Sequence, residues 1–464
     1  MKVERGGRIV AMPPEASAEL SHTYRTLPLG PGTSLHVLET GKWKTVFVDV
    51  FVRRELDEHA SEFAILPQVL KRGTSRAPDL RAMTRRLEEL YGATLGSEIL
   101  KIGELQVMLV RLEIVNAKYV PGAPRILEDG LDLLCDLLFD PRIEAGGFVP
   151  SFVEQEKRNL VRTIEGLLND KTAYASERCC QEMCAGEPFG LYEYGRVEDV
   201  RAIAPRRLYE FYRESFDRCP IDVFVAGDIE FERACELFSA RLSPRRRGDL
   251  APRVALPHPR ARPVREVIEK RQVKQGKLVL GLRSEITARD DRFPALLFAN
   301  GVLGAFPHSK LFRVVREREG LCYYASSSLE KTKGVMIVSS GIEPVHYARA
   351  RSLIEAQIDA VRAADLTEEE IEKTRKALSR GLRTIADSAS RTAVHWYTGL
   401  LNGRPSPLSA TLQAVERVSA AEVAEAARAT YLDTVYFLTA ERVAEAGPPG
   451  ARKTSERRAE EAAA

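Results

Sequence analysis

The sequence predicts an α+β protein with two homologous lobes, each a mainly antiparallel sheet packed with helices, which face each other across a cleft. Three observations support this fold class. The chain has 464 residues, and domains usually span roughly 100–200 residues, so one ordinary core cannot account for it. A segment rich in proline and arginine divides the chain at residues 243–263. The parts on either side show the same order of expected strands and helices.

The dividing segment holds five prolines and six arginines. Proline lacks the amide hydrogen that helix interiors and central strands require, so residues 243–263 are expected to form an exposed linker. This linker joins an N-terminal lobe, 1–242, to a C-terminal lobe, 264–445. Its arginines indicate a solvated spacer or, as the alternative, a patch for an acidic partner. Residues 446–464, rich in glycine, proline, charge and alanine, are expected to be a disordered tail.

Alternating apolar residues and short turns place the elements of the first lobe. A strand is expected at 45–52, helices at 63–70 and 79–90, a strand pair at 94–114, and a closing strand at 221–226. Strands joined by short turns run antiparallel, because parallel strands need long crossovers. The pair at 94–114 therefore favours an antiparallel sheet.

The second lobe repeats this plan with the same kinds of elements in the same order. Its expected elements are a strand at 278–282, helices at 293–303 and 309–318, a strand pair at 321–342, and a closing strand at 435–438. Placing Gly92 on Gly320, an offset of 228 residues, aligns the two strand pairs. An internal duplication is therefore expected, although few residues are identical between the halves.

Composition excludes several classes of protein. Apolar residues make up 44% and charged residues 29%, and the net charge is only +3. A nucleic-acid binder is usually strongly basic, so no nucleic-acid partner is expected. No apolar run approaches the ~20 residues that span a membrane, and the first residues lack an apolar signal segment, so neither membrane insertion nor secretion is expected. The odd number of cysteines, seven, then indicates reduced thiols in a cytoplasmic protein.

Three of these cysteines, Cys179, Cys180 and Cys184, cluster on an expected helix. A metal or redox site is one interpretation. The other is a set of small apolar residues that face a core, since free cysteine is usually buried. The chain lacks the two CxxC pairs that would support a zinc site, which favours the core.

One expected helix, within residues 63–74, resembles a helix of the insulinase-type (pitrilysin-type) metallopeptidases. Catalytic members carry His-x-x-Glu-His there, with a Gly-Thr pair at the distance that 73–74 has here. Counting back from that pair puts the two zinc-binding histidines on Ala64 and Gln68 and the general base on Pro67. Alanine and proline have no side-chain donor atoms, and a glutamine amide is a poor zinc ligand. The resemblance implies an inactive member that holds no metal and no other cofactor.

A second segment, residues 154–159, resembles the family helix that supplies the third, carboxylate ligand. Glu154 is the position that matches. Without the two histidines, the resemblance implies that Glu154 is a leftover surface or groove acid.

The third and most specific resemblance covers residues 309–323. Catalytic systems of the family hold an arginine and, seven residues later, a tyrosine, and Arg316 and Tyr323 have that spacing. An arginine can donate two hydrogen bonds to a peptide carbonyl, and a tyrosine hydroxyl can donate to an oxyanion. The alternative is structural: Arg316 forms a salt bridge on its helix and Tyr323 fills a strand face. Residues 304–308, Gly-Ala-Phe-Pro-His, depart from the glycine-rich loop that many such members have here.

The resemblance covers roughly residues 20–445 and implies a function. In two-subunit members of the family, one chain bears the zinc motif and the other bears the arginine–tyrosine pair. This sequence is similar to bacterial chains that carry the arginine–tyrosine pair and lack the zinc motif. It would be the non-catalytic subunit of a heterodimer, binding peptide substrate and lending Arg316 and Tyr323 to a zinc-bearing sister subunit. The alternative is a non-enzymatic peptide-binding or structural module of a larger complex. Only the first interpretation needs Arg316 and Tyr323.

Overall fold

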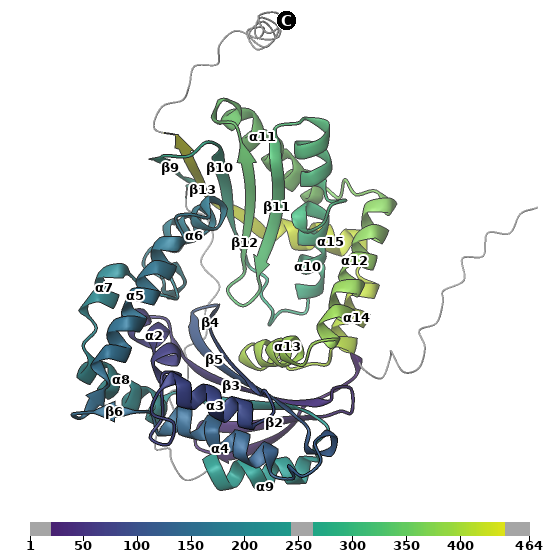
Figure 1. Cartoon of the computed structure of the whole chain (residues 1–464). Helices are drawn as coiled ribbons and strands as arrows, with labels where there is room; N and C mark the ends of the chain where they lie inside the picture. Colours follow the sequence, from purple (N-terminus) through teal and green to yellow (C-terminus); the bar gives the residue numbers. More distant parts are fainter. Residues whose placement is uncertain (1–19, 243–262, 441–464) are drawn as a thin grey trace, which may run out of the picture.

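The computed structural model describes residues 20–242 and 263–440. The segment expected to be a linker and the segment expected to be a disordered tail lie outside the described residues, apart from residue 263. The described residues form two lobes, each with its own sheet (Figure 1). The predicted two-lobed α+β fold is confirmed.

The first lobe is built on a six-stranded sheet in the order β1-β2-β8-β3-β5-β4. Its neighbours are antiparallel except for the parallel pair β2–β8. The strands are β1 (Arg25–Gly30), β2 (Thr33–Glu39), β3 (Thr45–Glu55), β4 (Thr94–Ile102), β5 (Leu105–Val115) and β8 (Ile221–Gly227). A separate short hairpin consists of β6 (Ile143–Glu144) and β7 (Gly147–Phe148).

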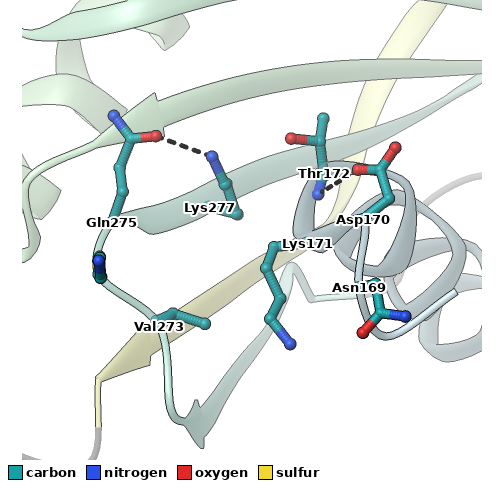
Figure 2. Close-up of a pocket in the computed structure, with 8 residues that line it drawn as sticks. Asn169, Asp170, Lys171, Thr172, Val273, Gln275 and Lys277 are labelled. Atoms are coloured by element: carbon teal, nitrogen blue, oxygen red, sulfur yellow. Dashed lines mark hydrogen bonds between the residues drawn. The ribbon is translucent and has the colours of Figure 1, made fainter. Parts of the chain in front are cut away.

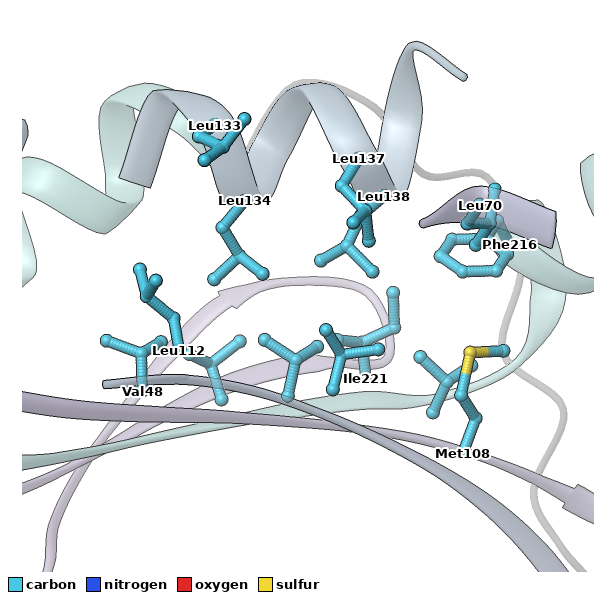
Figure 3. Close-up of a cluster of buried hydrophobic side chains, with 14 of the residues drawn as sticks. Val48, Leu70, Met108, Leu112, Leu133, Leu134, Leu137, Leu138, Phe216 and Ile221 are labelled. Atoms are coloured by element: carbon cyan, nitrogen blue, oxygen red, sulfur yellow. The ribbon is translucent and has the colours of Figure 1, made fainter. Parts of the chain in front are cut away.

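The helices of the first lobe cover the outer face of this sheet. They are α2 (Ala60–Leu70), α3 (Leu80–Glu89), α4 (Ile126–Phe139), α5 (Pro150–Gly166), α7 (Val197–Ala202), α8 (Pro205–Arg218) and α9 (Phe231–Leu242), with short turns η1 (Ala117–Tyr119) and η2 (Pro188–Gly190). In Figure 3, Leu134 and Leu138 of α4 lie over Val48 and Leu112 of the sheet. All four side chains are buried, which makes this face the core of the lobe.

The second lobe has a five-stranded sheet in the order β11-β12-β10-β13-β9, antiparallel except for β13–β9. The strands are β9 (Arg265–Arg271), β10 (Gly276–Ser284), β11 (Cys322–Glu330), β12 (Val335–Ile342) and β13 (Thr430–Ala440). The helices are α10 (Phe293–Asn300), α11 (Tyr347–Arg362), α12 (Glu368–Ala386), α13 (Ala389–Leu401), α14 (Leu408–Arg417) and α15 (Ala420–Arg428), with the short turn η5 (Pro344–His346). Two segments are π-helical, η3 (Gly301–Ala305) and η4 (Leu311–Arg318).

The predicted offset of 228 residues places β4 directly on β11. The glycines that precede these strands both have a left-handed backbone, with φ of 77° at Gly92 and 62° at Gly320. Glycine adopts this conformation without the steric cost of a side chain. The two strand pairs therefore share their entry turn, and their first strands, β4 and β11, both have nine residues.

Each sheet is covered on its inner face by a helix from the other lobe. Helix α13 of the second lobe packs on β3 and β8, where the ring of Tyr397 stacks on Phe51 with centroids 4.1 Å apart. Helix α6 (Lys171–Met183) of the first lobe packs on β10, β12 and β13 (Figure 1). Cys179 and Cys184 are fully buried in this second contact as free thiols, so the cluster belongs to a core. Burial raises the pKa of both thiols, which keeps them protonated.

Helix α6 can pack closely on its sheet because Gly281 of β10 has no side chain. A Cβ atom added at Gly281 of β10 would lie 2.8 Å from the Met183 sulfur and 3.1 Å from the Cys179 sulfur. We expect Gly281→Val to lower the free energy of unfolding by about 1–3 kcal/mol, because overpacking forces neighbouring groups to move. Thermal and urea denaturation measure this. In the control Gly96→Val, the nearest atom is 4.0 Å from the new Cβ, so a similar loss there would contradict the explanation.

Candidate functional site

The helix expected to carry a zinc motif is present, but its motif positions belong to the core. Ala64 is buried, and Pro67 lies inside α2 and is buried as well. Gln68 is half-buried, and its amide nitrogen donates to the Ser97 hydroxyl at 3.3 Å. Across residues 20–242 and 263–440, no group of three or more His, Cys, Asp or Glu side chains is placed to hold a metal ion.

Two glutamates of α5 have different surroundings. Glu154 is exposed and pairs with Lys157 at 2.9 Å, and that lysine also donates to the Ile203 carbonyl. Glu156 is only 5% exposed and accepts a hydrogen bond from Arg72, directly beyond the end of α2. The carboxylate that meets the degenerate zinc helix is therefore Glu156, and an arginine neutralises it. The resemblance of residues 154–159 to the family helix pointed to Glu154, and the sequence did not show that Glu156 lies against Arg72.

We expect the purified chain to bind no stoichiometric zinc, because Ala64, Pro67 and Gln68 supply no zinc ligands and Glu156 is engaged by Arg72. Metal analysis by mass spectrometry after dialysis against trace zinc measures this. The matched variant Ala64→His with Gln68→His restores two imidazoles at i and i+4. One tightly held zinc per wild-type chain would contradict the expectation.

Arg316 lies on the π-helical segment η4, near its end. The widened turn is visible in the bond from the Glu319 amide to the Val314 carbonyl, five residues back, at 3.0 Å. Arg316 is exposed, and its guanidinium lies over the Phe312 ring, 4.3 Å from the centroid. No acidic side chain in the described part of the chain lies within 4 Å of it. π-helical turns are frequently found at functional sites, which makes this segment a candidate for one.

Tyr323 lies on the edge strand β11, in a β-bulge. Cys322 pairs with Ile342 and Ala325 pairs with Ser340, so two residues, Tyr323 and Tyr324, oppose a single glycine. Bulges redirect side chains at sheet edges and near active sites. Tyr323 is 77% exposed, which leaves its hydroxyl free to reach another molecule. Arg316 is also close enough to Cys322 to lower the pKa of that thiol, against the larger effect of burial, which raises it.

The second tyrosine of the bulge turns toward the first lobe. The Tyr324 hydroxyl donates to Thr172 Oγ1 at 3.2 Å, at the start of α6. The Lys277 ammonium lies 5.2 Å from the Tyr324 ring centroid. The bulge thus sends one tyrosine to the lobe boundary and leaves Tyr323 in solvent.

A hollow of about 580 Å³ opens at this boundary beside Tyr324. In Figure 2, the start of α6 lines one side of it and the segment that leads into β10 lines the other. Its wall carries Lys171, Lys274 and Lys277 against the single acid Asp170. Burial lowers the pKa of Lys277, while Asp170 raises it. The hollow is therefore a basic concavity suited to acidic or carboxyl-bearing ligands.

The residues singled out from sequence form two groups, one in each lobe. Helix α2 packs against α5, α7, α8, β4 and β5, all of the first lobe. Arg316 and Tyr323 lie together on η4 and β11 of the second lobe. The segment at 304–308 is ordered, since Phe306 stacks on His308 and the His308 ring bonds the Thr374 hydroxyl at 3.0 Å.

A buried cluster of charges at the lobe junction was not predicted. Arg283 of β10, 4% exposed, donates to Glu187 of the first lobe at 2.7 Å and to Asp433 at 2.9 Å. Lys333, whose side chain is fully buried, pairs with Glu187 at 3.0 Å and with Glu104 of the first lobe. The pair of Lys333 and Glu104 joins the tip of the β4–β5 hairpin to the tip of the β11–β12 hairpin.

The sequence carried one signal for this junction. The offset of 228 residues maps the turn at 103–104 onto the turn at 331–332, so a two-fold arrangement of the lobes would bring the hairpin tips together. Glu104 and Lys333 have opposite charges near those tips. The contact between the two hairpins depends on how the lobes dock. The spacing of residues in the sequence does not specify this docking.

Comparisons with known proteins agree on one family. A family model described as the peptidase M16 inactive domain matches residues 202–378. The probable inactive metalloprotease YmfF of Bacillus subtilis is 35% identical over 410 residues, 88% of this chain and 96% of that protein. A conserved protein from Enterococcus faecalis superposes with a TM-score of 0.86 at 28% identity, over 91% of this chain and 100% of the other. A peptidase M16 inactive domain from Pseudomonas fluorescens shares the fold at TM-score 0.74 and 13% identity, over 91% of this chain and 100% of the other.

The chain belongs to the peptidase M16 family, the insulinase-type or pitrilysin-type metallopeptidases. Within that family it is an inactive homologue and not a peptidase in its own right. The resemblance inferred from the sequence is confirmed. In the described part of the chain, no helix combines the length and apolar character needed to cross a bilayer.

Proposed function

We propose that this chain is the non-catalytic subunit of a heterodimeric zinc peptidase. It binds peptide substrate and lends Arg316 and Tyr323 to an active site whose zinc a sister subunit of the same family holds. The observation that carries this proposal is the exposure of Tyr323, 77%, on a β-bulge beside an arginine that has no acidic partner within 4 Å among the described residues. If Tyr323 only filled a strand face, its ring would be buried. If Arg316 only formed a salt bridge on its helix, its guanidinium would lie beside an acidic side chain.

The position of α2 supports a partner from outside the chain. Helices α6 and α13 each cover the inner face of one sheet, and α2 packs within its own lobe. Arg316 and Tyr323 face solvent instead. A zinc site completed by these residues would therefore come from a second chain that docks over η4 and β11.

The test is reconstitution. The chain is purified from its native cell with bound proteins, and the partner is searched for His-x-x-Glu-His. We expect peptide cleavage by the mixed pair and little by either chain alone, because the pair divides zinc and oxyanion donor between subunits. Full activity of the sister alone would contradict the proposal. It would favour the alternative, a non-enzymatic peptide-binding or structural module, for which the basic hollow is the supporting feature.

A further inference from the structure

A separate hollow of about 570 Å³ lies inside the second lobe, among α10, α12, α13 and α14. Its walls are mainly apolar and include Phe293, Leu297, Phe306, Leu382 and Ile385. The exposed residues Asp291 and Arg404 also line it, so it opens to solvent. A concave apolar space with a few polar groups is the usual form of a small-molecule or side-chain site.

The polar groups that line this hollow come from one face of helix α13 and from the turn after β11. His395, Gly399 and Asn402 are spaced i, i+4 and i+7 along α13 and its end, so they share a face. Lys331, in the turn after β11, lines the same space. The His395 Nε2 donates to the Ser406 carbonyl at 3.3 Å, because a carbonyl can only accept. Burial, aided by Lys331, lowers the pKa of His395 to about 4, so the ring is neutral at pH 7.

Two of these groups lack partners. Asn402 is 4% exposed, and its amide nitrogen donates to Thr332 and to the Thr398 carbonyl, but its Oδ1 atom has no hydrogen-bond partner in the described residues. Lys331 also lines the hollow, and no salt bridge of its ammonium occurs within the described residues. Burial lowers the pKa of Lys331, while the nearby charge of Glu330 raises it. Its neighbour Glu330 accepts from the backbone amides of Lys333 and Gly103 instead. The Asn402 Oδ1 atom is enclosed, so it is not available to a molecule in the hollow. A buried cation without a counter-charge is costly, so a ligand that pairs with the Lys331 ammonium gains affinity.

We propose that this hollow binds an apolar amino-acid residue that has a free α-carboxylate. The carboxylate accepts from the Lys331 ammonium, and the apolar side chain fills the walls. A peptide C-terminus and a free N-acyl amino acid share this chemistry. The site does not depend on the proposed sister subunit.

The test uses the full chain and N-acetylphenylalanine in isothermal titration calorimetry. We expect saturable binding that is weakened about 10-fold to 100-fold when the carboxylate is replaced by an amide, or when Lys331→Met removes the ammonium, because hydrogen bonds to charged groups contribute most. Comparing N-acetylphenylalanine with a hexapeptide that ends in phenylalanine distinguishes the two sources: tighter binding of the peptide indicates a peptide C-terminus, and equal binding indicates an N-acyl amino acid.

A second variant fills the apolar part of the hollow and leaves Lys331 unchanged. A Cβ atom added at Gly381 of α12 meets nothing within 4 Å, so Gly381→Leu should fold and occlude the hollow. Lys376→Met, an exposed lysine of the same helix, is the matched control and should bind like the wild type. No binding of any probe, equal binding of acid and amide, or unchanged binding by Gly381→Leu would each overturn the proposal. Thermal melts of all variants confirm that they are folded.

Discussion

Tyr323→Phe is expected to lower the turnover of the reconstituted peptidase pair by about 10²–10³-fold, as loss of an oxyanion-hole donor does. The substitution removes one hydroxyl and keeps the ring. Tyr323 is 77% exposed and no hydrogen bond of its hydroxyl occurs in the described structure, so folding should not depend on that hydroxyl. Steady-state kinetics of the pair with a peptide substrate measure the effect.

Arg316→Ala should act differently on the same reaction. If the guanidinium holds a substrate carbonyl before the reaction, its loss raises KM more than it lowers kcat. Arg316 contacts Phe312 on its own helix and has no acidic partner within 4 Å in the described chain, so its removal should cost little stability.

Matched variants separate these roles from general effects. Tyr91→Phe removes the hydroxyl of another exposed tyrosine, 59% exposed, in the first lobe. Arg313→Ala removes an exposed arginine of the same segment as Arg316. Both should leave kinetics near wild type. Wild-type rates from Tyr323→Phe and Arg316→Ala would eliminate the catalytic contribution, whereas lost complex formation with normal melting would indicate an interface role.

Most of the fold could be predicted because local patterns specify it. Alternating apolar residues placed β3 and the strand pairs, and the left-handed glycines Gly92 and Gly320 marked the same turn in both lobes. The segment expected to be an ordinary helix at 309–318 is π-helical instead. A π-helical turn differs from an α-turn by a shifted hydrogen bond, and this shift leaves no clear trace in residue spacing.

The candidate site could be predicted only in part, because the exposure and the contacts of its residues depend on how distant parts of the chain pack together. Spacing identified Arg316 and Tyr323, but the exposure of Tyr323 depends on a bulge of β11 against β12. Likewise, Glu154 and Glu156 differ by two positions, and only the packing of α5 on α2 shows which one meets Arg72. The exchange of α6 and α13 between lobes depends on docking, which composition does not encode.

Lys333→Met is expected to lower the free energy of unfolding by about 3–5 kcal/mol, the cost of leaving buried charges without their partner. The side chain of Lys333 is fully buried and pairs with Glu104 and Glu187 of the other lobe. Glu187 keeps Arg283, at 2.7 Å, but Glu104 loses its cation. Urea unfolding measures the change, and the fluorescence of Trp396, which is buried at the lobe junction, reports on this region.

The control and the double variant test the cause. Lys373→Met breaks an exposed pair with Glu369 at 2.6 Å and should cost less than about 1 kcal/mol, because surface pairs contribute little. Adding Glu104→Gln to Lys333→Met removes the stranded charge as well, so the double variant should be more stable than Lys333→Met alone. A double variant as unstable as the sum of its single changes would show that Lys333 stabilises the junction by packing rather than by its charge.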